Sequence, residues 1–275
     1  MLNKPSHFRS LDDLLYATYE TIIDEGIPIK SKRNENLEIT QYAATLLNPR
    51  ARTSMSLDRK LVKSKFAEFA WYLSQNSELD YIEPYIEAYN REEQQNNRIL
   101  GAYGPKIFGS TDDQKPQFER IIEQIIKRKN TKQAYLVISE GIDYRYRGEQ
   151  FESPPCTIGL HFFVRDEKLN LTVHMRSNDA YLGLPHDLFC FTMLQEVVSC
   201  RTKIPLGYYT HYATSMHVYV EHINRIKQYL EEGKQEPIDM PEMQNCDTKT
   251  LNLVSNEFDR NSSISKYDEL DMYWK

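Results

Sequence analysis

The chain has 275 residues, of which 40% are hydrophobic, and a formal net charge of -6 at neutral pH. This length and composition indicate a globular chain with a core of its own, and they exclude a fibrous or disordered protein. The negative charge argues against a large nucleic-acid surface, although a small phosphate site needs only a few local arginines. An anionic partner is therefore expected to be small.

The sequence shows no membrane or export signal. The start, MLNKPSHFRS, has no apolar stretch, and no run approaches the roughly 18 apolar residues that a membrane-spanning helix needs. Four cysteines without a CxxC pair resemble neither a disulfide framework nor a zinc site. We expect a cytoplasmic protein without a membrane partner.

The N-terminal half has helical periodicity. Apolar residues spaced by three and four predict helices at 10–24 and 57–76, and Ser10 is placed to cap the first. The second helix carries Glu68 among aromatic residues, where an ionisable group is unfavourable unless it has a partner or a task. A third helix is predicted at 114–129.

The C-terminal half mixes strands with a helix. β-Branched and aromatic runs predict strands at 133–139, 157–164, 169–175 and 206–212. A hairpin turn is predicted at 165–168 and a buried helix at 187–201. Because strict βαβ alternation is absent, the expected fold class is α+β, in a single domain covering 1–275. The polar segment 234–275 is expected to be a mobile cover.

Cys156 is the candidate nucleophile. It follows two prolines and opens a predicted strand, so its sulfur is expected at the end of an element. A nucleophilic thiol needs cationic neighbours that lower its pKa. A single cysteine is more often a packing residue, and this is the interpretation for Cys190 and Cys200 in the predicted helix. Cys246 lies in the polar tail.

Several short motifs accompany Cys156. They are PPC at 154–156, HFFV at 161–164, MRSNDAYLGLP at 175–185 and MHVY at 216–219, preceded by RART at 50–53, EFAWYL at 68–73 and LGAYG at 100–104. In order and spacing these motifs resemble the thymidylate synthase family. The resemblance spans most of the chain. It implies the thymidylate synthase fold, with one large mixed β-sheet flanked by helices and a homodimer formed through that sheet.

The resemblance assigns Cys156 to one-carbon transfer onto C5 of a pyrimidine nucleoside monophosphate. The family adds a thiolate to C6, which makes C5 nucleophilic. Glu68 would organise water and relay protons. Tyr103 lies in the LGAYG motif, which resembles the tyrosine turn of the family, and it is expected to be a catalytic residue. The co-substrate would be 5,10-methylenetetrahydrofolate, with no metal. Asp179 would bind its pterin, together with Tyr85, which stands roughly where tryptophans are usual.

The resemblance also distributes the phosphate contacts. Arg176 would bind the phosphate and lower the pKa of the thiol, and Ser177 would add a hydroxyl. Arg50 and Arg52 would close over the phosphate from the first loop, although a solvated turn is the simpler interpretation of that pair. Lys132 stands where family members lend two arginines to the partner subunit, so one cation is lost. A ribose and a deoxyribose substrate both stay open.

His217 and Tyr219 are the candidate sugar ligands. They are two residues apart on an extended segment, so they point to the same side and could hydrogen-bond the 3'-hydroxyl. A buried histidine is more often a core group than a ligand. His211, His217 and His222 do not form a convincing metal-ligand set.

Asp187 occupies the position at which ordinary thymidylate synthases carry asparagine. An asparagine suits uracil, whereas a carboxyl accepts from the cytosine amine and, when protonated, donates to N3. The resemblance is therefore nearer the deoxycytidylate hydroxymethylase branch, in which water attacks the exocyclic methylene group. The alternative explanation of Asp187 is structural: an acidic residue at the N-terminus of a helix is stabilised by the helix macrodipole. We expect a (d)CMP 5-hydroxymethylase. A thymidylate synthase or dUMP hydroxymethylase, and a non-catalytic nucleotide- or RNA-binding protein on the same fold, are the alternatives.

Overall fold

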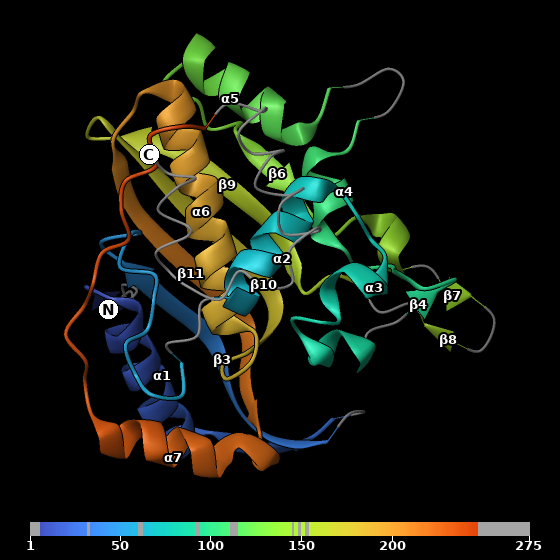
Figure 1. Cartoon of the computed structure of the whole chain (residues 1–275), viewed down its shortest axis with the longest axis vertical. Helices are drawn as coiled ribbons and strands as arrows, with labels where there is room; N and C mark the ends of the chain where they lie inside the picture. The colour runs from blue at the N-terminus through green and yellow to red at the C-terminus, as the bar shows by residue number, and fades with distance from the viewer. Residues whose placement is uncertain are drawn as a thin grey trace.

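A mixed β-sheet forms the centre of the molecule (Figure 1). The computed structural model describes residues 6–31, 34–59, 63–91, 94–110, 115–144, 146–147, 150–151 and 154–246. The sheet contains β1 (Ser6–Phe8), β2 (Ile27–Lys30), β3 (Glu35–Leu46), β6 (Tyr135–Val137), β9 (Thr157–Arg165), β10 (Lys168–Asp179) and β11 (Leu206–Tyr219). Its order is β1-β3-β11-β10-β9-β6, with β2 paired to β3. The β1–β3 and β10–β11 pairs are parallel and the others antiparallel, which confirms the α+β prediction.

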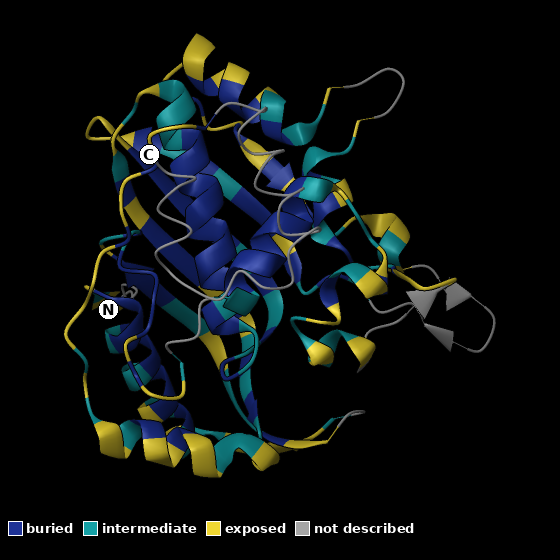
Figure 2. Ribbon diagram, in the orientation of Figure 1, coloured by how far each residue is buried: buried dark blue, intermediate teal, exposed yellow. Residues whose placement is uncertain are grey.

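Helices surround this sheet. They are α1 (Leu11–Glu25), α2 (Lys63–Ser74), α3 (Leu79–Ile82), α4 (Tyr103–Phe108), α5 (Gln117–Lys127), α6 (Leu184–Thr202) and α7 (Ile223–Glu232). In Figure 1, α6 and α2 cross one face of the sheet, and α7 runs beneath α1. Two small hairpins, β4 (Gln94–Gln95) with β5 (Arg98–Ile99) and β7 (Tyr146–Arg147) with β8 (Gln150–Phe151), lie outside the main sheet. Figure 2 shows the buried residues gathered on α6, α2 and the strands behind them.

The predicted helices are present, with changed ends. Ser10 caps α1, since its hydroxyl accepts from the Asp13 N–H at 3.1 Å. The described part of the second helix begins at Lys63, because residues 60–62 lie outside the described residues. The helix predicted at 187–201 begins earlier, at Leu184, with Pro185 in its first turn. Most of this helix is buried, so it forms the centre of the core.

The hairpin predicted at 165–168 is confirmed. Asp166 and Glu167 take positive φ angles of 50° and 59°, as a two-residue turn of the right twist requires. Beyond this turn, β10 and β11 run further than predicted, to Asp179 and Tyr219. The extra length carries the motif residues of both strands into parallel register.

β3 is the main element that the sequence pattern did not predict. Its buried and exposed residues do not alternate regularly, so the period-two signal is weak. Gln41 has a φ of 57°, and the pairing of β3 with β11 omits both Gln41 and Thr214, so the strands are interrupted there without a change of register. The helix α7 was also not predicted.

Cys200 and Cys246 form a disulfide, which corrects the interpretation of Cys200 as a packing residue and of the cysteines as unpaired. Their spacing of 46 residues carried no local signal. Residues 234–246 run back along the molecule to the end of α6, where the Met243 N–H donates to Glu196 at 3.0 Å. This part of the predicted cover is therefore anchored, while residues 247–275 lie outside the described residues. Cys190 is buried, as predicted.

Two buried histidines predict an acid-sensitive fold. Burial lowers the pKa of His186 and of His211 to about 3. Between about pH 6.5 and pH 3 the unfolded chain therefore binds protons that the folded chain does not. As the pH is lowered through this range, each of the two histidines should reduce the free energy of unfolding by about 1.4 kcal/mol per pH unit. In urea titrations, His211→Gln should remove about half of the dependence of the unfolding free energy on pH that the two histidines cause. His7→Gln, at an exposed histidine, should not. Equal slopes in all three proteins would contradict the prediction.

Candidate active site

Cys156 lies directly before β9, beside Arg176 on β10. The Arg176 backbone N–H donates to the Cys156 carbonyl at 2.9 Å. The guanidinium of Arg176 donates to the carbonyls of Pro154, at 2.7 Å, and Pro155, at 3.2 Å. Within the described part of the chain, no carboxylate lies in ion-pairing distance of Arg176. The guanidinium is therefore held by the two residues that precede the half-buried Cys156, and no acidic group in that part neutralises its charge.

Glu68 lies on α2 and is 4% exposed. Its Oε1 atom accepts hydrogen bonds from the hydroxyls of Tyr72, at 3.0 Å, and Tyr89, at 2.6 Å. Tyr72 is one turn further along α2, and Tyr89 comes from the short helix η1 (Glu87–Arg91). Burial raises the pKa of Glu68, and the two tyrosine hydrogen bonds counter that rise. Both donors satisfy one oxygen, which fixes the plane of the carboxyl group.

Asp187 is in the first turn of α6 and is 8% exposed. Its Oδ2 atom accepts from the side-chain amide of Asn178 at 2.8 Å. Burial, and next the charge of Glu68, raise the pKa of Asp187 well above its ordinary value, while the Asn178 hydrogen bond opposes this. Glu68 has two hydroxyl donors and Asp187 has one amide donor. When these carboxyls share a single negative charge, Glu68 is the better place for it and Asp187 holds the proton.

Tyr103 connects these groups. It begins α4, and its hydroxyl oxygen accepts from Thr157 through the backbone N–H, at 3.2 Å, and the side-chain hydroxyl, at 2.9 Å. Burial raises the pKa of Tyr103, and the negative charges of Asp187 and Cys156 raise it further. Because Asp187 in turn responds to the charge of Glu68, the four predicted catalytic residues form one electrostatic cluster.

The ends of β10 and β11 bring the predicted sugar, phosphate and folate residues together. Asp179 pairs with His217 in the parallel register, and Ser177 Oγ lies 3.5 Å from His217 Nδ1. The rings of His217 and Tyr219 meet edge to face, with centroids 5.2 Å apart, so both point to one side of the strand as expected. Asp179 Oδ1 accepts from two backbone N–H groups of the turn that follows it, which holds the carboxylate in place.

The structure does not bring Arg52 to this cluster. Its side chain is fully buried and pairs with Glu196 of α6, while its Nε and Nη1 atoms have no hydrogen-bond partner among the described residues. Arg50 instead pairs with Glu242 at 3.3 Å, and its carbonyl accepts from the Met240 N–H at 2.9 Å. Arg50 thus ties the first loop to residues 234–246 and Arg52 ties it to α6, and the phosphate role of both arginines stays a prediction.

Two further predicted residues lie on other elements. Lys132 is exposed, just before β6 at the edge of the sheet. Tyr85 is partly buried, and the Lys63 ammonium lies 5.6 Å from the centre of its ring. In the part of the chain that the structure describes, no hydrogen bond joins either residue to Cys156, Glu68, Asp187 or Tyr103.

Tyr72, Tyr89 and Asn178 are site residues that the sequence reasoning missed. Tyr72 had a usable signal, since it follows Glu68 by four residues on one helix and so faces the same side. Asn178 lies inside the motif at 175–185 without an assigned role, and Tyr89 lies four residues after Tyr85, outside the motifs. Their contacts depend on how η1 and β10 pack against α2 and α6, which no local pattern specifies.

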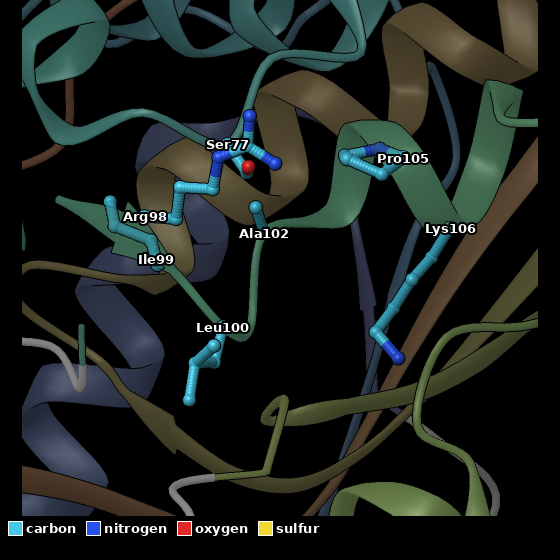
Figure 3. Close-up of a pocket in the computed structure, with 7 residues that line it drawn as sticks. All are labelled: Ser77, Arg98, Ile99, Leu100, Ala102, Pro105 and Lys106. Atoms are coloured by element: carbon cyan, nitrogen blue, oxygen red, sulfur yellow. The ribbon is translucent and has the colours of Figure 1, made fainter. Parts of the chain in front are cut away.

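A separate cavity of about 210 Å³ adjoins α4 (Figure 3). It is lined by Ser77, Arg98, Ile99, Leu100, Ala102, Pro105 and Lys106. None of the predicted site residues lines it, and Lys106 already pairs with Asp143 at 2.8 Å. This cavity is therefore not part of the cluster around Cys156.

The described residues contain no helix long and apolar enough to cross a membrane. In the same part of the chain, no three His, Cys, Asp or Glu side chains form a group that could hold a metal ion.

The fold and the site together define a class: α+β proteins with a thiol and two buried carboxyls beside the strand ends of a mixed sheet. The family model described as thymidylate synthase matches residues 17–271. The chain belongs to the thymidylate synthase family.

Three relatives show how far the similarity extends. A putative thymidylate synthase of Methanocaldococcus jannaschii is 33% identical over 123 residues, which cover 44% of this chain and 55% of that protein. The thymidylate synthase of Mycoplasma genitalium is 30% identical over 114 residues, covering 42% of this chain and 38% of that protein. The thymidylate synthase of Francisella philomiragia is 23% identical over 208 residues, which cover 72% of this chain and 73% of that protein. The match therefore spans about half or less of the first two relatives and almost three quarters of the third.

The hydrogen bonds on Glu68 predict a measurable pKa change. Tyr89→Phe removes a donor at 2.6 Å from the carboxylate, so the pKa of Glu68 should rise further. The titration of the Glu68 carboxyl carbon, followed by carbon-13 NMR, measures this. The control is Tyr16→Phe, because the ring of Tyr16 faces Lys234 rather than Glu68. An unchanged midpoint in Tyr89→Phe would show that this hydroxyl does not stabilise the carboxylate.

Proposed function

We propose that the protein transfers a one-carbon unit to C5 of cytidylate, with a 5-hydroxymethyl product. The family supplies the coarser part of this proposal, a folate-dependent C5 transfer to a pyrimidine nucleotide. The observation that carries the finer part is Asp187, a buried carboxyl with a raised pKa at the position of the family's asparagine. A neutral carboxyl can donate to cytosine N3 and accept from its amine.

Cys156 performs the covalent step. Its thiolate forms a bond to C6, and the electrons of the C5=C6 double bond move to C5, which becomes the nucleophile. The charge of Arg176 favours the thiolate, while its contacts with Pro154 and Pro155 hold the loop in position. Glu68, fixed through Oε1, orients water through its other oxygen and exchanges protons with the base.

The nucleotide contacts follow from the side chains gathered near the ends of β10 and β11. Arg176 and Ser177 receive the phosphate, and His217 with Tyr219 receives the sugar hydroxyl. Arg52 has no part in the proposal because it is buried against Glu196. Lys132 supplies its cation to the phosphate of a partner subunit.

The described residues also suit a folate. One oxygen of Asp179 is held by backbone N–H groups, and the second is left to accept from the pterin. Tyr85 offers a partly buried ring face. When bound, 5,10-methylenetetrahydrofolate supplies the one-carbon unit.

Thymidylate synthesis is the second candidate function. The curated relatives from Mycoplasma genitalium and Francisella philomiragia carry that name. In this case Asp187 would have to accommodate uracil.

We also propose a homodimer that forms through the sheet. The strand face turned away from α6 carries the half-exposed rings of Tyr135, Tyr208 and Tyr212, each 37–38% exposed. His174 stacks on Tyr212 with centroids 5.5 Å apart. An aromatic face without carboxylates or ammonium groups at its centre suits burial against a second copy of itself. It also places Lys132, at the sheet edge, near the partner.

The base preference can be read from isotope release. With methylenetetrahydrofolate, the protein should release tritium from C5 of dCMP at least about tenfold faster than from dUMP. Cys156→Ser should abolish release from both, because no adduct at C6 forms. Asp187→Asn should reverse the preference. Release from dUMP alone by the unmodified protein would favour the thymidylate reading, and release by Cys156→Ser would exclude the covalent mechanism.

The dimer gives a separate prediction. Tyr212→Glu places a charge in the aromatic face, so the protein should sediment as a monomer and bind the nucleotide about tenfold more weakly, for want of the partner's phosphate contact. Ile126→Glu is the control, since Ile126 is 64% exposed on α5, outside the sheet. A Tyr212→Glu protein that sediments as the unmodified one does would place the interface elsewhere.

A further inference from the structure

Asn178 contacts the group that selects the base. It lies on β10 between Ser177 and Asp179, is 4% exposed, and donates its Nδ2–H to Asp187 Oδ2 at 2.8 Å. Gly183 makes room for this contact, because a Cβ atom there would lie 2.8 Å from Asn178 Nδ2 and 3.4 Å from Asp187 Oδ2. The hydrogen bond thus joins the strand that carries the phosphate residues to the first turn of α6.

A neutral carboxyl has two unlike oxygens. The carbonyl oxygen is the stronger acceptor, and the hydroxyl oxygen carries the only donor. An amide N–H held against Oδ2 favours the form in which Oδ2 is the carbonyl oxygen. When Asp187 is protonated, its proton is therefore on Oδ1.

The position of that proton distinguishes the two bases. Cytosine has an acceptor at N3 and a donor at its 4-amine, so the carboxyl must donate towards N3 and accept from position 4. Uracil has a donor at N3 and an acceptor at O4, so the same carboxyl must accept at N3 and donate towards position 4. A carboxyl that is free to exchange its proton between oxygens would suit both bases. One with a fixed proton suits one base.

We propose that Asn178 is a specificity-determining positioning residue, which fixes Asp187 Oδ2 as the acceptor for the cytosine amine and leaves Oδ1–H to donate to N3. This inference rests on the proposed function of Asp187. Asn178 acts through that carboxyl and needs no contact with the base. Replacing it should relax the choice of base more than it slows the reaction.

Asn178→Leu keeps the size of the side chain and removes the donor. We expect the ratio of kcat/KM for tritium release from dCMP to that from dUMP to fall by about tenfold, because the hydrogen bond no longer favours one proton position. Asn178→Ala is the second variant, should the leucine not fold. Loss of folded protein lowers both rates equally and leaves the ratio unchanged, so the ratio separates positioning from stability.

Asn170→Ala is the matched control. Asn170 is also a buried asparagine of β10, and its contacts are with the Lys168 carbonyl and the Tyr208 N–H, away from Asp187. Its replacement should leave the ratio within about twofold. The ratio of dissociation constants of dCMP and dUMP, measured by calorimetry without folate, should follow the same order in all variants.

The outcomes separate this inference from the proposed function. A ratio that stays within twofold in both Asn178 variants would overturn the role of Asn178, whichever base the unmodified protein prefers. A preference of the unmodified protein for dUMP would overturn the cytidylate proposal and the assignment of Oδ1–H to N3. If the ratio still shifted in the Asn178 variants, Asn178 would still determine which oxygen of Asp187 carries the proton. In that case Oδ1–H would face position 4 of the base, and Oδ2 would face N3.

Discussion

Two carboxyl groups buried where α2 meets α6 are the constraint on which the site depends. A carboxyl removed from water is unfavourable unless donors compensate for the lost hydration. Glu68 receives the hydroxyls of Tyr72 and Tyr89, and Asp187 receives the amide of Asn178. These donors come from α2, η1 and β10, so the packing of those elements and the protonation of the two acids are coupled.

The parallel pairing of β10 with β11 supplies the second condition. Because Asp179 is opposite His217 in this register, the predicted phosphate, folate and sugar residues lie at the same end of two neighbouring strands. A slip of one residue would turn His217 and Tyr219 to the other face. The long connection through α6 makes this register a tertiary property, set by the core around that helix.

Local chemistry in the sequence predicted local structure well. The Ser10 cap and the hairpin turn at Asp166 and Glu167 follow from side-chain and backbone preferences within a few residues. The motif resemblance placed Cys156 beside Arg176. What the sequence did not predict depends on distant contacts: Gln41 interrupts the alternation of β3, Arg52 pairs with Glu196 inside the protein, and the Cys200–Cys246 disulfide needs the return of residues 234–246. None of these has a signature within one element.

The same distinction bears on how base choice is encoded. An aspartate at position 187 has two acceptor oxygens when ionised, and in that form it has no donor for the base. Burial and the charge of Glu68 raise its pKa, which favours the neutral form, and we propose that Asn178 then decides which oxygen holds the proton. Under this proposal, exchange of asparagine for aspartate at this one position is an incomplete description of cytosine recognition. The proposed selecting unit is Asp187 together with the acid that holds the charge and the amide that orders the proton.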